Sequence, residues 1–411
     1  MSAEVPRNRF RNNDVAIGIG NRFWNACEAH GLAGIVADLE GAELVSKDGH
    51  RFLNLSCCSY LDLDRHPKVI QGAVDALTRY GVLDHCIPRS RVQIPALLEL
   101  EAVLSELFDA QVVTAISANV ASTGMLPLIA SGHLTGGVRP VMLFDKYCHV
   151  SMAASKPVCG DETEVVTIRH HDLEAIESYC RKHASVCYVC DGSDSLGGYA
   201  PVAALTALQE RYGLHVFYDD SHSLSVVGKR GQGYVRSHVD EIGPRTIIVA
   251  TLNKAFGTSG AALMMSGRSR EELRVIERFS GGMSFSQPMN TAAIGASLAS
   301  AGLHMSDVLG ELQAQLRQNI AKFDELCPTK QVGGEFPIRL IPFDEDTVIE
   351  AGQRVYRAGY YASPVFFPIV PKGQAGLRAM VRAGLSSKDL EGFASAVLDH
   401  PVSRRLEGTP C

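Results

Sequence analysis

The sequence predicts an α/β fold in which helices cover both faces of a mostly parallel sheet. Short apolar runs rich in Val, Ile and aromatic residues alternate with longer helix-like stretches along much of the chain. Runs that are apolar at nearly every position indicate strands buried on both faces, and their alternation with helices is typical of a parallel sheet. Ligands bind such sheets at the carboxyl ends of the strands. The residues directly after each run are therefore the first candidates for chemistry.

The expected strands are short, and helices separate them. The strands span residues 111–117, 140–144, 164–168, 185–190, 214–218 and 246–251. The helices span residues 122–132, 151–156, 171–183 and 202–212.

The chain changes character after about residue 300. A helix over 306–327 is followed by PIRLIPF, a helix near 345–359, and the segments YYASPVFFPIVP and GLRAMVRAG. This succession predicts a smaller α+β domain. We therefore divide the chain into an N-terminal segment over 1–60, a large domain over 61–300 and a small C-terminal domain over 301–411. The N-terminal segment is expected to pack on the small domain or on a partner.

Composition and charge narrow the function classes. Of the 411 residues, 46% are hydrophobic and 20% are charged, as in ordinary globular proteins. Asp and Glu number 45 against 39 for Lys and Arg, and the net charge of −6 argues against nucleic acid or an anionic membrane as a partner. The sequence has no apolar run long enough for a membrane span, and its first residues lack the apolar core of a secretion signal. A cytoplasmic protein is expected.

The cysteines are predicted to be reduced thiols. Their total, 11, is odd, and most of them lie in or beside apolar segments. Cys187 and Cys190 form a C-x-x-C pair, which we interpret as two residues of a buried strand because no second pair supports zinc. No metal site is predicted.

Two groups with cofactor chemistry come after expected strands. Lys254 lies in TLNKAFGTSGAA, where small residues indicate a tight turn. Desolvation in such a turn would lower the pKa of the amine and favour imine formation. Asp219 lies in FYDDSHS and could pair with a protonated pyridine nitrogen, with Asp220 as the alternative. His222, three residues after Asp219, could reach a ring hydroxyl or a substrate group.

Two further groups precede them in the chain. His149 comes after VMLFDKYC, and its imidazole could stack on a flat ring or act as an acid or base. The segment from Ser117 to Ser122, SANVAS, begins an expected helix whose free N–H groups suit a phosphate. The sequence lacks the glycine-rich patterns of nucleotide sites. Each residue alone has an ordinary structural explanation, but the four in this order favour one phosphorylated cofactor.

Three longer segments carry a family resemblance. YDDSHSLSVVGKRGQG, TLNKAFGTSGAA and FPIVPKGQAGLR, in this order, resemble the motifs of the α-oxoamine synthases. The resemblance runs from about Leu53 to the C-terminal helix. It implies a fold-type-I pyridoxal 5′-phosphate enzyme that forms a homodimer.

The resemblance also implies roles for single residues. Lys254 would hold the cofactor as a Schiff base and remove a Cα proton. Asp219 would bind the pyridine nitrogen, His222 the ring hydroxyl, and His149 would stack on the ring. The remaining cofactor contacts would come from Ala118, Asn119, Ser195 and Thr251, and from Ser286 and Gln287 reaching across the dimer. Substrate would be bound by Arg378, through a carboxylate, and at Ser59, where the family usually has asparagine.

The implied reaction is that of an acyltransferase. An amino acid would condense with an acyl thioester, either acyl-CoA or an acylated acyl carrier protein, and lose carbon dioxide to give an α-amino ketone. Another fold-type-I reaction, such as that of an aminotransferase or an aldol-type carbon–carbon lyase, is the main alternative. A non-catalytic partner subunit is a third hypothesis, which the presence of Lys254, Asp219 and His222 together disfavours.

One segment departs from the family pattern. Residues 84–95, DHCIPRSRVQIP, replace a glycine-rich stretch that normally shapes the substrate pocket. Arg89 and Arg91 in this segment have two interpretations: they bind an anionic or pantetheine-phosphate partner, or they have a structural role.

Overall fold

The computed structural model describes residues 10, 13–367 and 369–398. The chain divides into two compact units. Residues Leu61–Gln313 form the larger unit, and Met1–Tyr60 with Ala314–Cys411 form the smaller one. The predicted three-part division stays a prediction, and each unit is described by itself.

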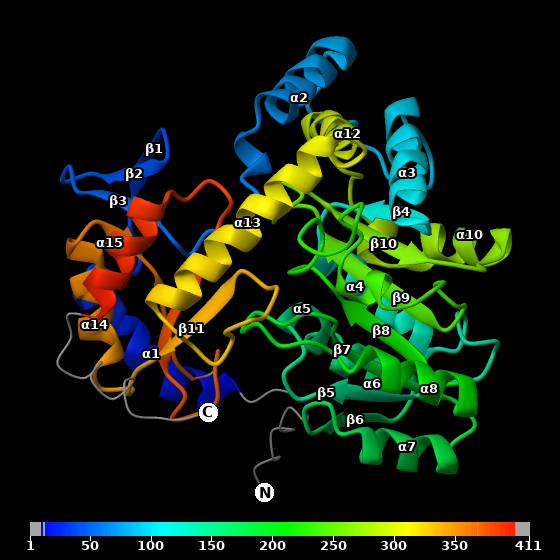
Figure 1. The fold of residues 1–411 in the computed structure, drawn as a ribbon. Helices are drawn as coiled ribbons and strands as arrows, with labels where there is room; N and C mark the ends of the chain where they lie inside the picture. The colour runs from blue at the N-terminus through cyan, green and yellow to red at the C-terminus, as the bar shows by residue number, and fades with distance from the viewer. Residues whose placement is uncertain (1–9, 11–12, 368, 399–411) are drawn as a thin grey trace, which may run out of the picture. The chain divides into compact units, whose positions relative to one another are not determined.

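A seven-stranded sheet forms the centre of the larger unit (Figure 1), with the strand order β4-β10-β9-β8-β7-β5-β6. Its strands are β4 (Gln111–Ala115), β5 (Val141–Asp145), β6 (Val165–Ile168), β7 (Val186–Asp191), β8 (His215–Asp219), β9 (Thr246–Thr251) and β10 (Ala261–Met265). β5 to β9 pair in parallel, and β10 is antiparallel to β4 and β9. The mostly parallel sheet is confirmed. β10 is an addition that the sequence did not predict.

The helices of this unit are η1 (Leu63–Arg65), α2 (Pro67–Tyr80), α3 (Pro95–Phe108), α4 (Ala118–Ala130), α5 (Val150–Ala153), α6 (Lys156–Glu162), α7 (Leu173–Lys182), α8 (Val202–Tyr212), α9 (Tyr234–Ser237), α10 (Arg270–Phe279), α11 (Gly282–Phe285) and α12 (Thr291–His304). The predicted single helix over 151–156 is wrong, because α5 ends at Ala153 and a separate helix, α6, begins at Lys156. Pro157 occupies the first turn of α6, where its missing N–H is tolerated. α4 begins four residues before the prediction, after Ser117, whose side chain caps it.

The sheet is buried on both faces. Tyr188 and Tyr218 point to one face and join a core with Leu100 and Leu104 of α3. Neighbouring strand residues that point to the opposite face, such as Phe217, are also fully buried. Burial on both faces explains why the strands read as continuous apolar runs.

The described residues of the smaller unit form two sheets and several helices. Its helices are α1 (Asn13–Ala29), α14 (Val348–Arg357) and α15 (Ser387–Leu398), and α13 (Asp307–Leu326) contains the boundary between the units. One sheet has the order β1-β2-β3-β12 and the other β11-β14-β13. The strands are β1 (Ala37–Glu40), β2 (Glu43–Ser46), β3 (Arg51–Asn54), β11 (Ile338–Pro342), β12 (Tyr360–Tyr361), β13 (Ser363–Val365) and β14 (Gly376–Met380). β3 pairs with β12, so the N-terminal segment shares a sheet with C-terminal residues.

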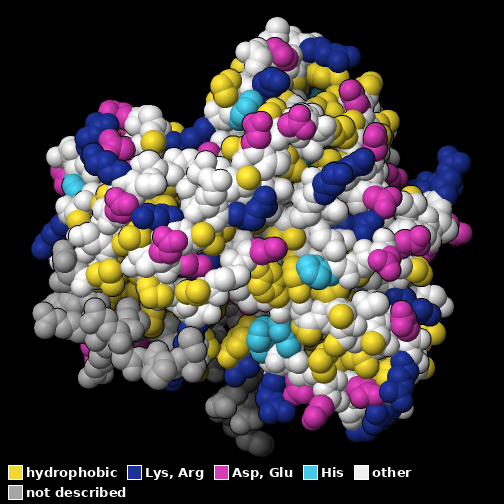
Figure 2. Space-filling model, viewed as in Figure 1, with side chains coloured by type: hydrophobic (Ala, Val, Ile, Leu, Met, Phe, Trp, Pro, Cys, Tyr) yellow, Lys and Arg dark blue, Asp and Glu magenta, His cyan; other side chains and the backbone are white. Residues whose placement is uncertain are grey.

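The surface and the helices add two observations. None of the described helices combines the length and the low polarity that crossing a membrane requires. Acidic and basic side chains are interspersed over the face shown in Figure 2.

Helices α2 and α12 cross at two glycines, which leads to a stability prediction. A Cβ atom on Gly295 would lie 2.2 Å from the carbonyl oxygen of Gly72 and 2.4 Å from the Cβ atom of Ala76. Gly295→Ala is therefore expected to lower the free energy of unfolding by about 1–3 kcal/mol through overpacking. Urea unfolding measures the change. The control is Gly302→Ala, on the same helix with nothing near its Cβ position. The free energy of unfolding of that variant is expected to rise by up to about 1 kcal/mol. Equal effects of the two substitutions would contradict the prediction.

Candidate active site

Several polar side chains end neighbouring strands of the large sheet. Asp145, Asp191, Asp219 and Thr251 are the last residues of β5, β7, β8 and β9. These strands are consecutive in the sheet, and Asp191 lies opposite Asp219 in the ladder. Three carboxylates and a hydroxyl therefore meet at the carboxyl edge, where ligands of such sheets bind.

A cavity of about 240 Å³ lies at this edge. Its lining includes eight residues that the sequence predicted: Ala118, Asn119, His149, Ser195, Asp219, His222, Thr251 and Lys254. Ser117, Ser151, Asp191, Ser193, Ser221 and Asn253 complete it. The sequence reasoning thus selected residues that the fold brings together, although their individual roles stay predictions.

Four predicted residues are placed elsewhere. Ser286 and Gln287 lie directly after α11 and do not line the cavity of this chain, and their expected contact with a partner's phosphate stays a prediction. Ser59 is buried and Arg378 lies on β14, both in the smaller unit. Their substrate-binding roles also stay predictions.

Lys254 lies in a tight turn between β9 and β10. The N–H of Gly257 donates to the carbonyl of Lys254 at 2.9 Å, and the N–H of Leu252 donates to the carbonyl of Gly260 at 2.9 Å. Gly257 has a φ of +77°, and a Cβ atom there would lie 2.5 Å from the backbone nitrogen of Asp64. Only glycine fits this position. The turn holds the partly buried Lys254 beside the cavity.

Asp219 and Asp220 have different surroundings. Asp219 lines the cavity, where its Oδ1 accepts a hydrogen bond from the N–H of Ser221 at 3.1 Å. Asp220 is fully buried, and it accepts hydrogen bonds from Ser193 at 3.1 Å and from the N–H of Val235 at 2.9 Å. Burial raises the pKa of Asp220 to about 7, although these bonds oppose the shift. The surroundings favour Asp219 over Asp220 as the cofactor ligand.

His149 presents a neutral imidazole to the cavity. Its Nδ1 lies 2.8 Å from the hydroxyl of Ser151 and accepts from the N–H of that residue at 3.2 Å. Burial lowers the pKa of His149, and the nearby Lys254 lowers it further, against the opposing effect of Asp219. A neutral flat ring suits stacking on a cofactor.

The start of α4 presents backbone N–H groups to the cavity, where the sequence predicted a phosphate. Ser117 caps the helix by accepting a hydrogen bond from the N–H of Val120 at 3.2 Å. Ala118 and Asn119, the first helical residues, line the cavity. Their N–H groups and the helix dipole favour an anion there. The hydroxyl of Thr251, also on the cavity wall, contacts the Asn253 side chain.

Asp191 is the clearest residue that the sequence reasoning missed. It lines the cavity, and its Oδ1 accepts a hydrogen bond from the N–H of His149 at 3.0 Å. Burial and the neighbouring Asp219 carboxylate raise the pKa of Asp191. The signal was present in the sequence, because Asp191 comes directly after an expected strand just as Asp219 does.

The segment 84–95 shows what one of its arginines does. Arg89 is buried, and its guanidinium forms two hydrogen bonds with the carboxylate of Glu101, at 2.8 and 3.0 Å. It also donates to the carbonyl of Thr114 at 3.1 Å. Arg89 therefore has the structural role. Arg91 is exposed, and both interpretations stay open for it.

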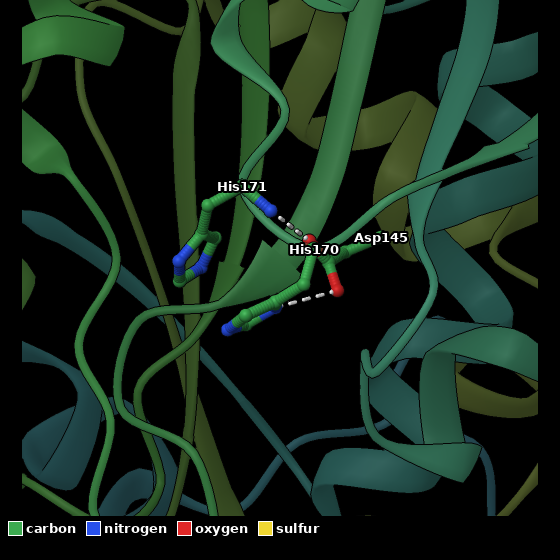
Figure 3. Close-up of side chains that lie close together, drawn as sticks. All are labelled: Asp145, His170 and His171. Carbon is green, nitrogen blue, oxygen red and sulfur yellow. Dashed lines mark hydrogen bonds and ion pairs between the residues drawn. The ribbon is translucent and has the colours of Figure 1, made fainter. Parts of the chain in front are cut away.

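The side chains of Asp145, His170 and His171 form a cluster beside β5 (Figure 3). Their potential ligand atoms lie within 4.8 Å of one another, as a metal site would require. However, Asp145 accepts four hydrogen bonds: from the ring of His170, the N–H of His171, the N–H of Tyr147 and the hydroxyl of Tyr188. These fill the acceptor positions of a carboxylate, so the cluster is a hydrogen-bond network.

This network predicts a dependence of stability on pH. The hydrogen bond to Asp145 raises the pKa of His170 above 6.5, whereas burial lowers the pKa of His171. Because the folded protein holds the His170 proton more tightly, its stabilisation is full below pH 6.5 and disappears as pH rises through the folded-state pKa. At pH 5.5 the free energy of unfolding of the wild type is expected to exceed that of His170→Asn by up to about 1 kcal/mol. Urea unfolding at pH 5.5 and pH 9 tests this, and an equal difference at both pH values would contradict it.

The groups around the cavity match the parts of one cofactor. Pyridoxal 5′-phosphate carries an aldehyde for an amine, a ring nitrogen for a carboxylate and a phosphate for a helix N-terminus. Lys254, Asp219 and the first residues of α4 present those partners to the same cavity. The fold and the cavity therefore define the class: a fold-type-I pyridoxal-phosphate enzyme.

Comparison with known proteins gives the family. The chain belongs to the aminotransferase class I and II family, whose model matches residues 52–397. An 8-amino-7-oxononanoate synthase of Methylocella silvestris is 28% identical over 363 residues, which cover 86% of this chain and 98% of that protein. A second, from Thermoanaerobacter pseudethanolicus, is 27% identical over 85% of this chain and 87% of its own length. These relatives agree with the resemblance to the α-oxoamine synthases.

Solved structures show the same fold. A serine palmitoyltransferase of Sphingomonas wittichii superposes with a TM-score of 0.79 at 20% identity, covering 97% of this chain and all (100%) of that one. An 8-amino-7-oxononanoate synthase of Francisella tularensis superposes with a TM-score of 0.70 at 18% identity. The match covers 87% of this chain and 98% of that one. The fold-type-I architecture expected from the sequence is confirmed.

Proposed function

We propose that this chain catalyses the decarboxylative condensation of an amino acid with an acyl thioester, giving an α-amino ketone. One observation carries the proposal: a single cavity gathers Lys254, Asp219, His149 and His222, in a chain whose relatives are named 8-amino-7-oxononanoate synthases. Bound pyridoxal phosphate supplies an electron sink for negative charge at the Cα atom of the amino acid.

The residues of the cavity divide the work. The Nζ atom of Lys254 takes the Cα proton and later returns a proton to the product. The carboxylate of Asp219 keeps a proton on the pyridine nitrogen, and His222 binds the ring hydroxyl. The neutral ring of His149 covers one face of the cofactor, and its lowered pKa keeps it uncharged beside the Lys254 amine.

Phosphate and side-chain contacts complete the cofactor site. The N–H groups of Ala118 and Asn119 and the hydroxyl of Thr251 bind the phosphate. Ser195 lies on the same cavity wall and contacts the ring.

Substrate binding and assembly extend the proposal. Arg378 binds the amino-acid carboxylate through a bidentate pair, and Ser59 is a second substrate-binding residue. The enzyme acts as a cytoplasmic homodimer in which Ser286 and Gln287 reach the partner's phosphate. Support for a second copy comes from two aromatic side chains that precede Ser286 in the chain, Phe279 and Phe285, which are 67% and 76% exposed.

The test is a balance of products. The purified enzyme is incubated with a panel of amino acids, each paired with acyl-CoA or acylated acyl carrier protein. The proposal expects carbon dioxide and free thiol in equal amounts, and only when both substrates are present. Lys254→Ala serves as the inactive control. Keto acid formation without thiol release would instead support an aminotransferase, the alternative that the unusual segment 84–95 keeps open.

A further inference from the structure

The turn that carries His149 is held at consecutive backbone positions. The N–H of Tyr147 donates to Oδ1 of Asp145 at 2.7 Å, and the N–H of Cys148 donates to the carbonyl of Asp145 at 3.3 Å. The next N–H, that of His149, donates to Asp191 at 3.0 Å. Two strand-end aspartates, from β5 and β7, therefore fix the path of the turn.

Asp145 is itself fixed by groups from two other strands or their ends. The ring of His170 and the N–H of His171, which lie just after β6, contact its two oxygens at 3.0 and 2.9 Å (Figure 3). The hydroxyl of Tyr188, on β7, donates to Oδ2 at 2.6 Å. Although burial opposes ionisation, hydrogen bonds from His170 and Tyr188 lower the pKa of Asp145 to about 2. The group is a carboxylate, whose two oxygens can serve all four donors.

We propose that Asp145 is a positioning residue for His149. It does not line the cavity, but its carboxylate ties the turn before His149 to β6 and β7. The imidazole of His149 can cover the cofactor only if that turn keeps its path, since its own side-chain contact is with Ser151, two residues further on. The inference rests on the part of the proposed function that assigns His149 to the cofactor.

The test substitutes an amide for the carboxylate. Asp145→Asn keeps the shape of the side chain but replaces one acceptor oxygen with an NH₂ donor. Each oxygen accepts two of the four hydrogen bonds, so two of them are lost. We expect the dissociation constant for pyridoxal phosphate to rise roughly tenfold and the visible circular dichroism of the bound cofactor to change. A displaced ring also lowers kcat/KM by roughly 10- to 100-fold.

The matched control is Asp172→Asn. Asp172 lies in the loop that carries His170 and His171, and caps α7 by accepting from the N–H of Ala175 at 3.1 Å. Asparagine caps helices as well as aspartate does. Cofactor affinity and circular dichroism are expected to stay at wild-type values.

A double-mutant cycle with His149→Ala separates positioning from general damage. If Asp145 acts through His149, Asp145→Asn causes no further loss of cofactor affinity once the imidazole is gone. The same loss in both backgrounds, or no loss in either, would overturn the proposal. Tyr188→Phe removes one donor to Asp145 and gives a milder variant for the same cycle, should Asp145→Asn fail to fold. Cofactor affinity and circular dichroism need no amino acid or thioester, so the result stands apart from failure of the proposed reaction.

Discussion

Lys254→Ala is expected to lower kcat/KM for the condensation by about 1,000-fold or more. One amine is assigned both the covalent hold on the cofactor and the transfer of the Cα proton, and each role alone is worth orders of magnitude in rate. The absorbance band of a cofactor bound through Lys254 is expected to disappear. Borohydride reduction followed by peptide mass analysis checks the attachment: the wild type retains the cofactor on the peptide containing Lys254, and the variant does not.

An exposed lysine provides the control for this experiment. Lys229 lies in the loop after β8 and is exposed. Lys229→Ala is expected to keep both the absorbance band and the rate. Covalent retention of the cofactor by Lys254→Ala, at the wild-type level, would show that another amine holds it and would remove the basis of the mechanism.

The ends of the strands explain how much of the fold and of the cavity the sequence predicted. The apolar runs predicted β4 to β9 within one or two residues, because strands buried on both faces leave a continuous pattern. Polar residues a short distance after these runs include His149, Asp219 and Lys254, which the fold brings to one cavity. Asp191 also comes directly after an apolar run, but no role was assigned to it from the sequence.

Other features depend on contacts that no local pattern records. The order of strands places β10 between β4 and β9, and the sequence carries no local sign of that pairing. Asp145 gains its role from His170 and Tyr188, which are 25 and 43 residues away in the chain. The significance of such a residue depends on which strands become neighbours, so it could not be predicted before the topology was known.

The role of Arg89 also depends on contacts that the sequence does not record, and its loss is expected to lower stability strongly. Its charge suggested either an anionic partner or a structural role, and the structure pairs it with Glu101. Glu101 also accepts the N–H and the hydroxyl of Thr114 at 2.7 and 2.8 Å, so the pair joins α3 to the edge strand β4. Arg89→Met keeps the apolar stem but leaves the Glu101 carboxylate, 12% exposed, without its cation. The free energy of unfolding is expected to fall by about 3–5 kcal/mol.

Two further variants distinguish lost pairing from lost packing. In the Arg89→Met/Glu101→Gln double variant the charge of Glu101 is also removed, and the other carboxylate beside Arg89, that of Glu277, is 32% exposed. The glutamine oxygen still accepts from Thr114, so we expect much of the lost stability to return. Arg91→Met, two residues away and exposed, is expected to change stability by less than about 0.5 kcal/mol. Urea unfolding of the four proteins, wild type included, gives the comparison. If Arg89→Met kept wild-type stability and instead weakened thioester binding, the arginine would be a ligand for an anion, because a buried pair cannot lose its cation without a cost in stability.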